Sequence, residues 1–234
     1  MNRIQPWTEN KKAPRNERRV EQSLLRSTCR RGQHLAFFGP LHYEEKYAYP
    51  LLVWLHGPGD DERQLQRVMP FISMRNYVAV GPRGVLSSEP CPGYTWPDVD
   101  ADPGHAEQVI FDAIEAAKER FHVAPHRVFL AGYRHGGTLA IRTALRHPLT
   151  VAGALTLGGP FPLESHALGH LELIRQLPLF IAAGNDAEEY PIDRTCEELR
   201  LFHAAGMSVT IRQYPCDDAL TTQMLHDMDG WIME

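Results

Sequence analysis

The sequence predicts an α/β fold with a mostly parallel, twisted sheet that carries helices on both faces. Three observations lead to this prediction. The 234 residues and the ordinary apolar content of 43% are enough for one domain with a sizeable core. Short continuous apolar runs, such as YPLLVWLH, are typical of strands buried on both faces. Segments of helical periodicity separate these runs, and strands that alternate with helices form parallel sheets.

Each expected element has a local signal. Between the first two apolar runs, Leu65, Val68 and Met69 recur at helical spacing. Asp102 is the expected N-cap of a long helix whose first residue is Pro103. The expected elements, in chain order, are strand 49–56, helix 60–73, strand 77–80, a Pro/Gly-rich loop 81–97, helix 103–121, strand 127–131, helix 136–146, strands 151–157 and 177–183, helix 196–205, strand 208–214 and helix 221–232.

The N-terminal segment differs in charge from the rest of the chain. Residues 1–31 carry nine Lys/Arg against three Asp/Glu, in a chain of net charge −5. We therefore divide the chain into a basic N-terminal extension, 1–31, and a folded domain, 32–234. We expect the extension to be partly disordered or to dock through one short helix around Val20, Leu24 and Leu25. Nucleic-acid binding by this arm is the disfavoured alternative, because nothing in it would read bases.

Composition and motifs argue against several classes of protein. No apolar run approaches the roughly 18 residues that a membrane-spanning helix needs. The first residues, MNRIQPWTENKK, lack the apolar core of a signal peptide, so we expect a cytoplasmic protein with no membrane association. The four cysteines form no CxxC pair, and no HExxH or Walker motif occurs. We therefore expect neither a metal nor a cofactor.

Four segments carry a family resemblance, and each includes the end of an expected strand and the loop after it. LLVWLHGPGDD looks like a strand and a His-Gly-x-Gly-Asp oxyanion loop, and RVFLAGYRHGGTLA looks like a Gly-x-Ser-x-Gly-Gly nucleophile elbow. PLFIAAGNDAEEYPID looks like an acid-bearing loop, and YPCDDALTTQMLHDMDGWI like a histidine loop with the last helix. Together they resemble the carboxylesterase/phospholipase-like branch of the α/β-hydrolases, which includes acyl-protein thioesterases and predicted esterases. The resemblance covers about residues 35–234 and implies the α/β-hydrolase fold.

The catalytic triad that this resemblance implies is not present at the matching positions. The serine, the acid and the histidine of the family fall on Arg134, Ala187 and Asp218. A guanidinium stays protonated and cannot act as a nucleophile. Asp186 could serve as the acid after a slip of one residue. His226 lies in the expected last helix, beyond the loop, where we expect an exposed or helix-packing role.

The oxyanion hole implied by the resemblance is also incomplete. Its two backbone N–H donors fall on Pro58 and His135. Proline has no N–H, so only the His135 donor remains. Losing one such donor typically costs about 100- to 1,000-fold in rate. The sequence therefore predicts that all the catalytic positions are affected together.

We expect a catalytically inactive homologue, a pseudoenzyme that acts by binding or assembly. A buried arginine needs a carboxylate, so we expect Arg134 to pair with Asp218, with Asp186 or Asp217 as further partners. This pair either plugs a disused pocket, the interpretation that we favour, or presents Arg134 to a small anionic ligand. Trp96 is expected either in that pocket or as a core anchor. The candidate pocket residues are His56, Gly57, Gly59, Trp96, Arg134, His135, Asp186 and Asp218.

Other interpretations stay open at this point. The runner-up is a carboxylesterase- or thioesterase-type hydrolase with an unconventional site built from His135, Asp186, Asp218 or Cys216. If the chain acts by binding, its partner is a small anion, another protein or a second copy of the chain in a homo-oligomer.

Overall fold

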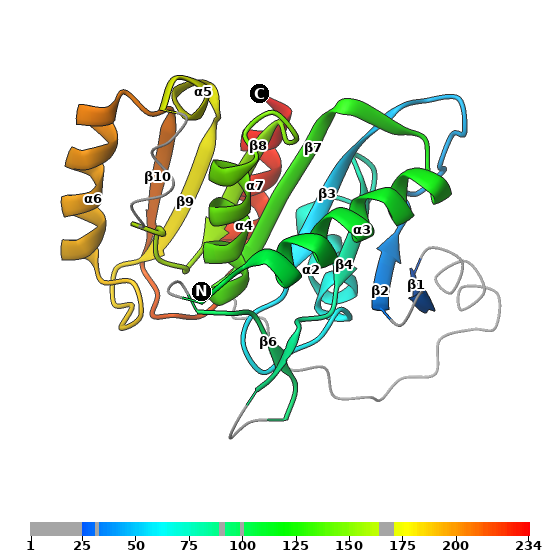
Figure 1. The fold of residues 1–234 in the computed structure, drawn as a ribbon, viewed down its shortest axis with the longest axis horizontal. Coiled ribbons are helices and arrows are strands. Elements are labelled where there is room, and N and C mark those ends of the chain that lie inside the picture. The colour runs from blue at the N-terminus through cyan, green and yellow to red at the C-terminus, as the bar shows by residue number, and fades with distance from the viewer. Residues whose placement is uncertain (1–24, 31–32, 89–91, 99–100, 164–170) are drawn as a thin grey trace.

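The computed structural model describes residues 25–30, 33–88, 92–98, 101–163 and 171–234 (Figure 1). The strands are β1 (Leu25–Arg30), β2 (Gln33–Phe38), β3 (Tyr49–Leu55), β4 (Val78–Pro82), β5 (Leu86–Ser87), β6 (Tyr94–Thr95), β7 (Val123–Tyr133), β8 (Gly153–Leu157), β9 (Leu179–Gly184) and β10 (Val209–Tyr214). The helices are α2 (Gln64–Ile72), α3 (Gly104–Arg120), α4 (His135–Arg146), α5 (Leu171–Gln176), α6 (Ile192–Ala205) and α7 (Thr222–Met233).

One 8-stranded sheet organises these elements, in the order β1-β2-β4-β3-β7-β8-β9-β10. The strands from β4 across to β10 run parallel, and β1 and β2 are antiparallel to their neighbours. The predicted mostly parallel sheet is thus confirmed. Parallel strands end at the same edge of the sheet, so the loops after β3, β4, β7, β9 and β10 meet there.

Helices cover both faces of the sheet, as the sequence predicts. Side chains of α2 and α7 share one apolar core with the sheet, for example Leu65, Met69 and Met228. Side chains of α3, α4 and α6 pack into the other core, for example Ile110 and Ile141. Figure 1 shows α3 and α4 in front of the sheet and α7 behind it. In the described part of the chain, no helix has both the length and the apolarity needed to cross a membrane.

The start of the sheet differs from the prediction. Residues 25–30, which we assigned to the extension 1–31, form β1 and pair with β2, so this part of the predicted extension belongs to the sheet. Leu25 therefore lies in a strand and not in a short helix, whereas Val20 and Leu24 fall outside the described residues. An edge strand is held by backbone hydrogen bonds, so the polar sequence LRSTCR gives no apolar pattern to recognise.

Smaller differences concern the helices. The structure adds α5, and α6 begins at Ile192, ahead of the expected residue 196. Pro103, and not Asp102, is the N-cap of α3, although the Asp102 carboxylate accepts the Gly104 N–H at 3.0 Å. Capping contacts set the ends of helices, and the apolar periodicity of the sequence does not contain those contacts.

Candidate functional site

Arg134 stands at the turn between β7 and α4, where the resemblance implies the nucleophile. Its backbone has φ 50° and ψ −122°, a conformation that side-chain-bearing residues rarely adopt. The turn is tight because β3 passes close to it: a Cβ on Gly136 would lie 2.3 Å from the Leu55 carbonyl oxygen. The sharply bent elbow is therefore present, and Arg134 carries a guanidinium at the position where the resemblance implies a hydroxyl.

The Arg134 side chain pairs with Glu189, in the loop after β9. Its Nε and Nη2 groups contact the two carboxylate oxygens of Glu189, a two-point arrangement. The two side chains are 27% and 32% exposed. This corrects the expected partner, since we had placed Asp218 there with Asp186 or Asp217 in support. Glu189 could have been suspected from the acid-rich segment NDAEEYP.

Asp218 has a different task in the structure. Its carboxylate accepts the backbone N–H groups of Glu188 at 3.1 Å and Glu189 at 3.2 Å. Its carbonyl oxygen accepts the hydroxyl of Tyr133, the residue just before the elbow. Asp218 was expected beside Arg134 on the family pattern, but two backbone donors already satisfy its carboxylate. It acts on Arg134 indirectly, by fixing the loop that carries Glu189.

The other expected acid and nucleophile candidates are not assembled into a catalytic set. Ala187 is 7% exposed, and Asp186 is exposed to solvent beside it. The Asp186 N–H donates to the Cys216 carbonyl at 3.0 Å, and the Cys216 residue is 6% exposed. His226 is an exposed residue of α7, in agreement with its expected role. The described residues contain no group of three or more His, Cys, Asp or Glu that could hold a metal ion.

The loop expected to supply the oxyanion hole directs its N–H groups elsewhere. The Gly57 N–H donates to Gln64 Oε1 at 3.2 Å, and the Gly59 N–H donates to the Tyr94 carbonyl at 3.0 Å. Between them, Pro58 has no N–H. The side chain of His135 is half-buried, with its Nδ1 3.3 Å from Thr95 Oγ1. This loop therefore presents no spare donor at Gly57, Pro58 or Gly59.

His56 and Trp96, two expected pocket residues, are parts of the core. His56 Nε2 accepts the Gly84 N–H at 2.8 Å, so Nδ1 carries the proton and donates to the Gly57 carbonyl at 2.8 Å. Burial lowers the pKa of His56 below its usual 6.5. Trp96 is 1% exposed and donates Nε1–H to the His56 carbonyl at 2.9 Å. Of the two roles expected for Trp96, the structure gives it the anchoring one.

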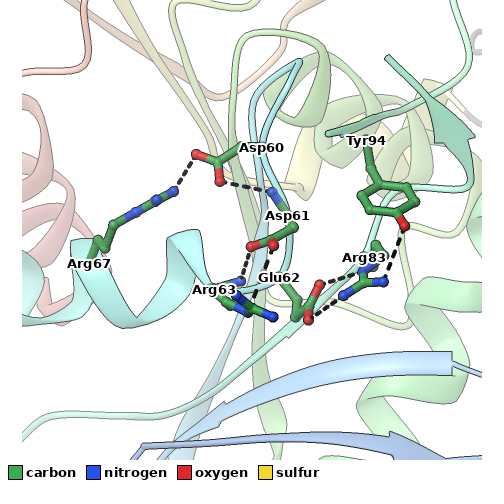
Figure 2. A network of polar contacts seen from close by, with 7 residues as sticks. All are labelled: Asp60, Asp61, Glu62, Arg63, Arg67, Arg83 and Tyr94. Carbon is green, nitrogen blue, oxygen red and sulfur yellow. Dashed lines mark hydrogen bonds and ion pairs between the residues drawn. The ribbon is translucent and has the colours of Figure 1, made fainter. Parts of the chain in front are cut away.

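A cavity lies beside the residues at the end of β4, between the start of β2 and α3. Its volume is about 430 Å³, and Arg83 stands in its wall. Arg83 Nε and Nη2 donate to the two carboxylate oxygens of Glu62 at 2.7 and 2.8 Å, as Figure 2 shows. No motif in the sequence points to Arg83, Glu62 or Tyr94. The lining residues are Gln33, His34, Arg83, Gly84, Val85, Tyr94, His105 and Val109.

Comparisons with known proteins agree with this architecture. No family model matches the chain. A rice (Oryza sativa subsp. japonica) protein named "probable carboxylesterase" is 28% identical over 135 residues, which are 50% of this chain and 57% of the rice protein. The match thus spans little more than half of that relative. Carboxylesterase SOBER1 of Arabidopsis thaliana is 22% identical over 205 residues, which are 79% of this chain and 90% of SOBER1.

Solved structures show the same fold. A carboxylesterase from Mesorhizobium loti superposes with a TM-score of 0.70 at 22% identity, over 88% of this chain and 98% of that protein. The Bacillus cereus carboxylesterase superposes with a TM-score of 0.67 at 19% identity, over 86% of this chain and 93% of that protein. The chain therefore has the α/β-hydrolase fold, and its homologues are carboxylesterases, as the resemblance in its sequence implies.

Proposed function

We propose that this chain is a non-catalytic relative of the carboxylesterases that acts by binding or assembly. The observation that carries the proposal is the elbow, where Arg134 holds the bent position and is neutralised by Glu189. A guanidinium cannot form an acyl intermediate, because it stays protonated at ordinary pH. Fold alone does not bring an activity with it, so the relatives' chemistry does not carry over.

The surroundings of Arg134 support the same proposal. The acyl-transfer mechanism of such folds needs a base beside the nucleophile and donors for the oxyanion. Asp218, which the resemblance matches to the histidine of the family, already accepts two backbone N–H groups. The N–H groups of Gly57 and Gly59 donate to Gln64 and Tyr94. The Asp218 carboxylate and the N–H groups of Gly57 and Gly59 therefore take part in the packing of the loops, and of the two implied oxyanion donors only the His135 N–H is left.

The charge around the elbow disfavours anion binding at Arg134, and it favours an Arg134–Glu189 pair that only fills the site. Glu189 neutralises Arg134, and the two loops beside it add the carboxylates of Asp186, Glu188 and Asp218. An anion approaching Arg134 would meet this excess of negative charge. We therefore infer that Arg134 and Glu189 close the disused pocket, and that ligands or partners bind elsewhere on the molecule.

The runner-up, an unconventional ester or thioester hydrolase, makes the opposite prediction in one experiment. Hydrolysis of p-nitrophenyl acetate and of a short-chain acyl thioester is measured for the wild type, a buffer blank, Arg134→Ala and Asp218→Ala. The exposed Arg63 provides a matched control, Arg63→Ala. We expect every protein to match the blank. Turnover by the wild type that Arg134→Ala or Asp218→Ala abolishes, and Arg63→Ala preserves, would overturn the proposal.

Assembly is tested separately from catalysis. Light scattering coupled to gel filtration gives the mass of the particle in solution, and a monomer has a mass of 26.5 kDa. A mass that is a multiple of this value supports action as a homo-oligomer. A monomer directs the search to ligands and to other protein partners.

A further inference from the structure

We propose that the cavity beside Arg83 binds a small monocarboxylate with an apolar body, such as an aromatic or short-chain acid. The cavity lies at the carboxyl end of β4, between the start of β2 and the first turns of α3. Ligands of open α/β sheets bind at this edge. The inference goes beyond the proposed function, because it concerns other residues than the elbow and holds whether or not the elbow is catalytic.

The Arg83 guanidinium is held in one orientation before any ligand arrives. The carboxylate of Glu62, whose side chain is 1% exposed, accepts hydrogen bonds from Nε and Nη2 of Arg83. Nη1 of Arg83 donates to the Tyr94 hydroxyl at 3.3 Å. The guanidinium carbon also lies 4.6 Å from the centroid of the Tyr94 ring. Figure 2 shows Arg83 fixed between Glu62 and Tyr94. A donor that is already ordered loses little entropy on binding.

Two donors remain for a carboxylate at this point. Arg83 Nη1 carries two N–H groups, and its contact with Tyr94 needs one of them. The Tyr94 hydroxyl accepts from Arg83, so its own hydrogen is left for another acceptor. Hydrogen bonds in such a chain strengthen one another, and a charged partner makes them stronger still. His34 and His105 add imidazole groups from β2 and α3 to the same cavity.

The remaining walls suit an apolar body. Val85, Val109 and the ring of Tyr94 line the cavity together with the polar groups. A volume of about 430 Å³ lies within the range of roughly 300–1,000 Å³ that is usual for sites of small organic ligands. A cavity with apolar walls and a few converging donors selects an organic acid over a bare inorganic anion.

The charge balance selects a single negative charge. Asp60, Asp61 and Glu62 are paired with Arg67, Arg63 and Arg83 (Figure 2). Asp112, whose carboxylate accepts the amide of the lining residue Gln33 at 2.8 Å, adds a further negative charge beside the cavity. Arg83 shares its charge with a buried carboxylate, and a dianion would be repelled by that carboxylate. We therefore propose a monocarboxylate as the ligand, and we expect inorganic phosphate not to bind at this site.

Benzoate is the probe, and the dependence of the melting temperature on its concentration gives the dissociation constant. For a ligand of this size we expect a value on the order of 1 mM. Benzamide is the neutral ligand of the same shape, and inorganic phosphate, measured at a pH above its second pKa, is the dianion. Tyr94→Phe removes only the hydroxyl, and Val85→Trp fills the cavity. Tyr47→Phe, at a half-exposed tyrosine outside the cavity lining, and Arg134→Ala are the control variants.

The expected result is stabilisation by benzoate but not by benzamide or phosphate. Binding is about tenfold weaker in Tyr94→Phe, absent in Val85→Trp, and unchanged in Tyr47→Phe and Arg134→Ala. No stabilisation of the wild type, or equal effects of benzoate with benzamide or phosphate, would overturn the proposal. Binding that survives in Val85→Trp but is lost in Arg134→Ala would also overturn it, because the acid would then occupy the elbow. The ester assay on the same proteins decides the proposed function independently.

Discussion

Arg134 and Arg83 each pair with a glutamate through two contacts, yet they stand in different surroundings. The Arg134–Glu189 pair is about one third exposed and covers a tight turn. In the Arg83–Glu62 pair, the glutamate is 1% exposed and the arginine 18% exposed, and a cavity lies beside them. We infer that the Arg134–Glu189 pair closes the elbow, whereas a cavity stays open beside the Arg83–Glu62 pair. The two arginines therefore differ in how deeply their glutamate is buried and in whether a cavity lies beside the pair.

The largest expected effect separates the two glutamates. Glu62→Gln leaves a largely buried arginine without its counter-charge, so we expect a loss of about 3 kcal/mol in the free energy of unfolding. Glu189→Gln, the matched change at the elbow, is expected to cost about 1 kcal/mol or less, because its pair is partly solvated. Urea unfolding measures both. Equal losses would remove the difference on which the comparison rests.

At the elbow, Asp218 is expected to contribute more to stability than its exposed neighbour. Asp218→Ala removes the acceptor of two backbone N–H groups, and we expect a loss of about 2 kcal/mol in urea unfolding. The matched control is Asp186→Ala, an exposed position, with a change of about 0.5 kcal/mol or less. A harmless Asp218→Ala would show that the loop of Glu189 is held by other contacts.

The bent backbone of Arg134 gives a smaller effect with a diagnostic sign. Glycine adopts a positive φ without strain, so Arg134→Gly is expected to be more stable than Arg134→Ala by about 1 kcal/mol. At Arg63, with φ −72° and ψ −12°, the order reverses, because alanine lowers the entropy of the unfolded chain. Thermal unfolding of the four variants checks both signs. The same order at both positions would argue against a strained elbow.

The smallest effect concerns His56. Its Nε2 accepts the N–H of Gly84, the residue that follows Arg83. The pKa of His56 is lowered in the folded state. Below pH 6.5 the imidazole therefore binds a proton more readily in the unfolded chain than in the folded one. Stability therefore falls as the pH drops through 6.5, with a contribution under about 1 kcal/mol between pH 7 and 6. In His56→Gln this pH dependence is expected to be shallower than in the wild type. Identical slopes in the two proteins would contradict the role of His56.

The sequence predicts the fold well because the fold depends on patterns that single segments carry. The apolar run of β3 and the glycines around Arg134 each fix one local geometry, and four such segments in order identify the architecture. β1 and α5 carry no comparable pattern. β1 owes its place to its backbone pairing with β2, which a polar sequence does not reveal.

The candidate site is predicted less completely. The sequence shows Arg134 at the position that the resemblance assigns to the nucleophile, because the flanking glycines fix that position. Its partner depends on how two loops fold over the sheet, so the pattern points to Asp218 while the structure pairs Glu189. Arg83 and Glu62 lie 21 positions apart, and only the folded chain shows that they meet beside a cavity.

Covalent trapping tests the central claim most directly, because it does not depend on the choice of acyl group. The purified protein is incubated with an alkyl fluorophosphonate, which reacts with activated nucleophiles of serine hydrolases, and its intact mass is then measured beside a carboxylesterase with a serine at the elbow. We predict that the carboxylesterase gains one adduct and that this chain keeps its unmodified mass. A stoichiometric adduct on this chain that Arg134→Ala or Asp218→Ala abolishes would show an active nucleophile and contradict the account.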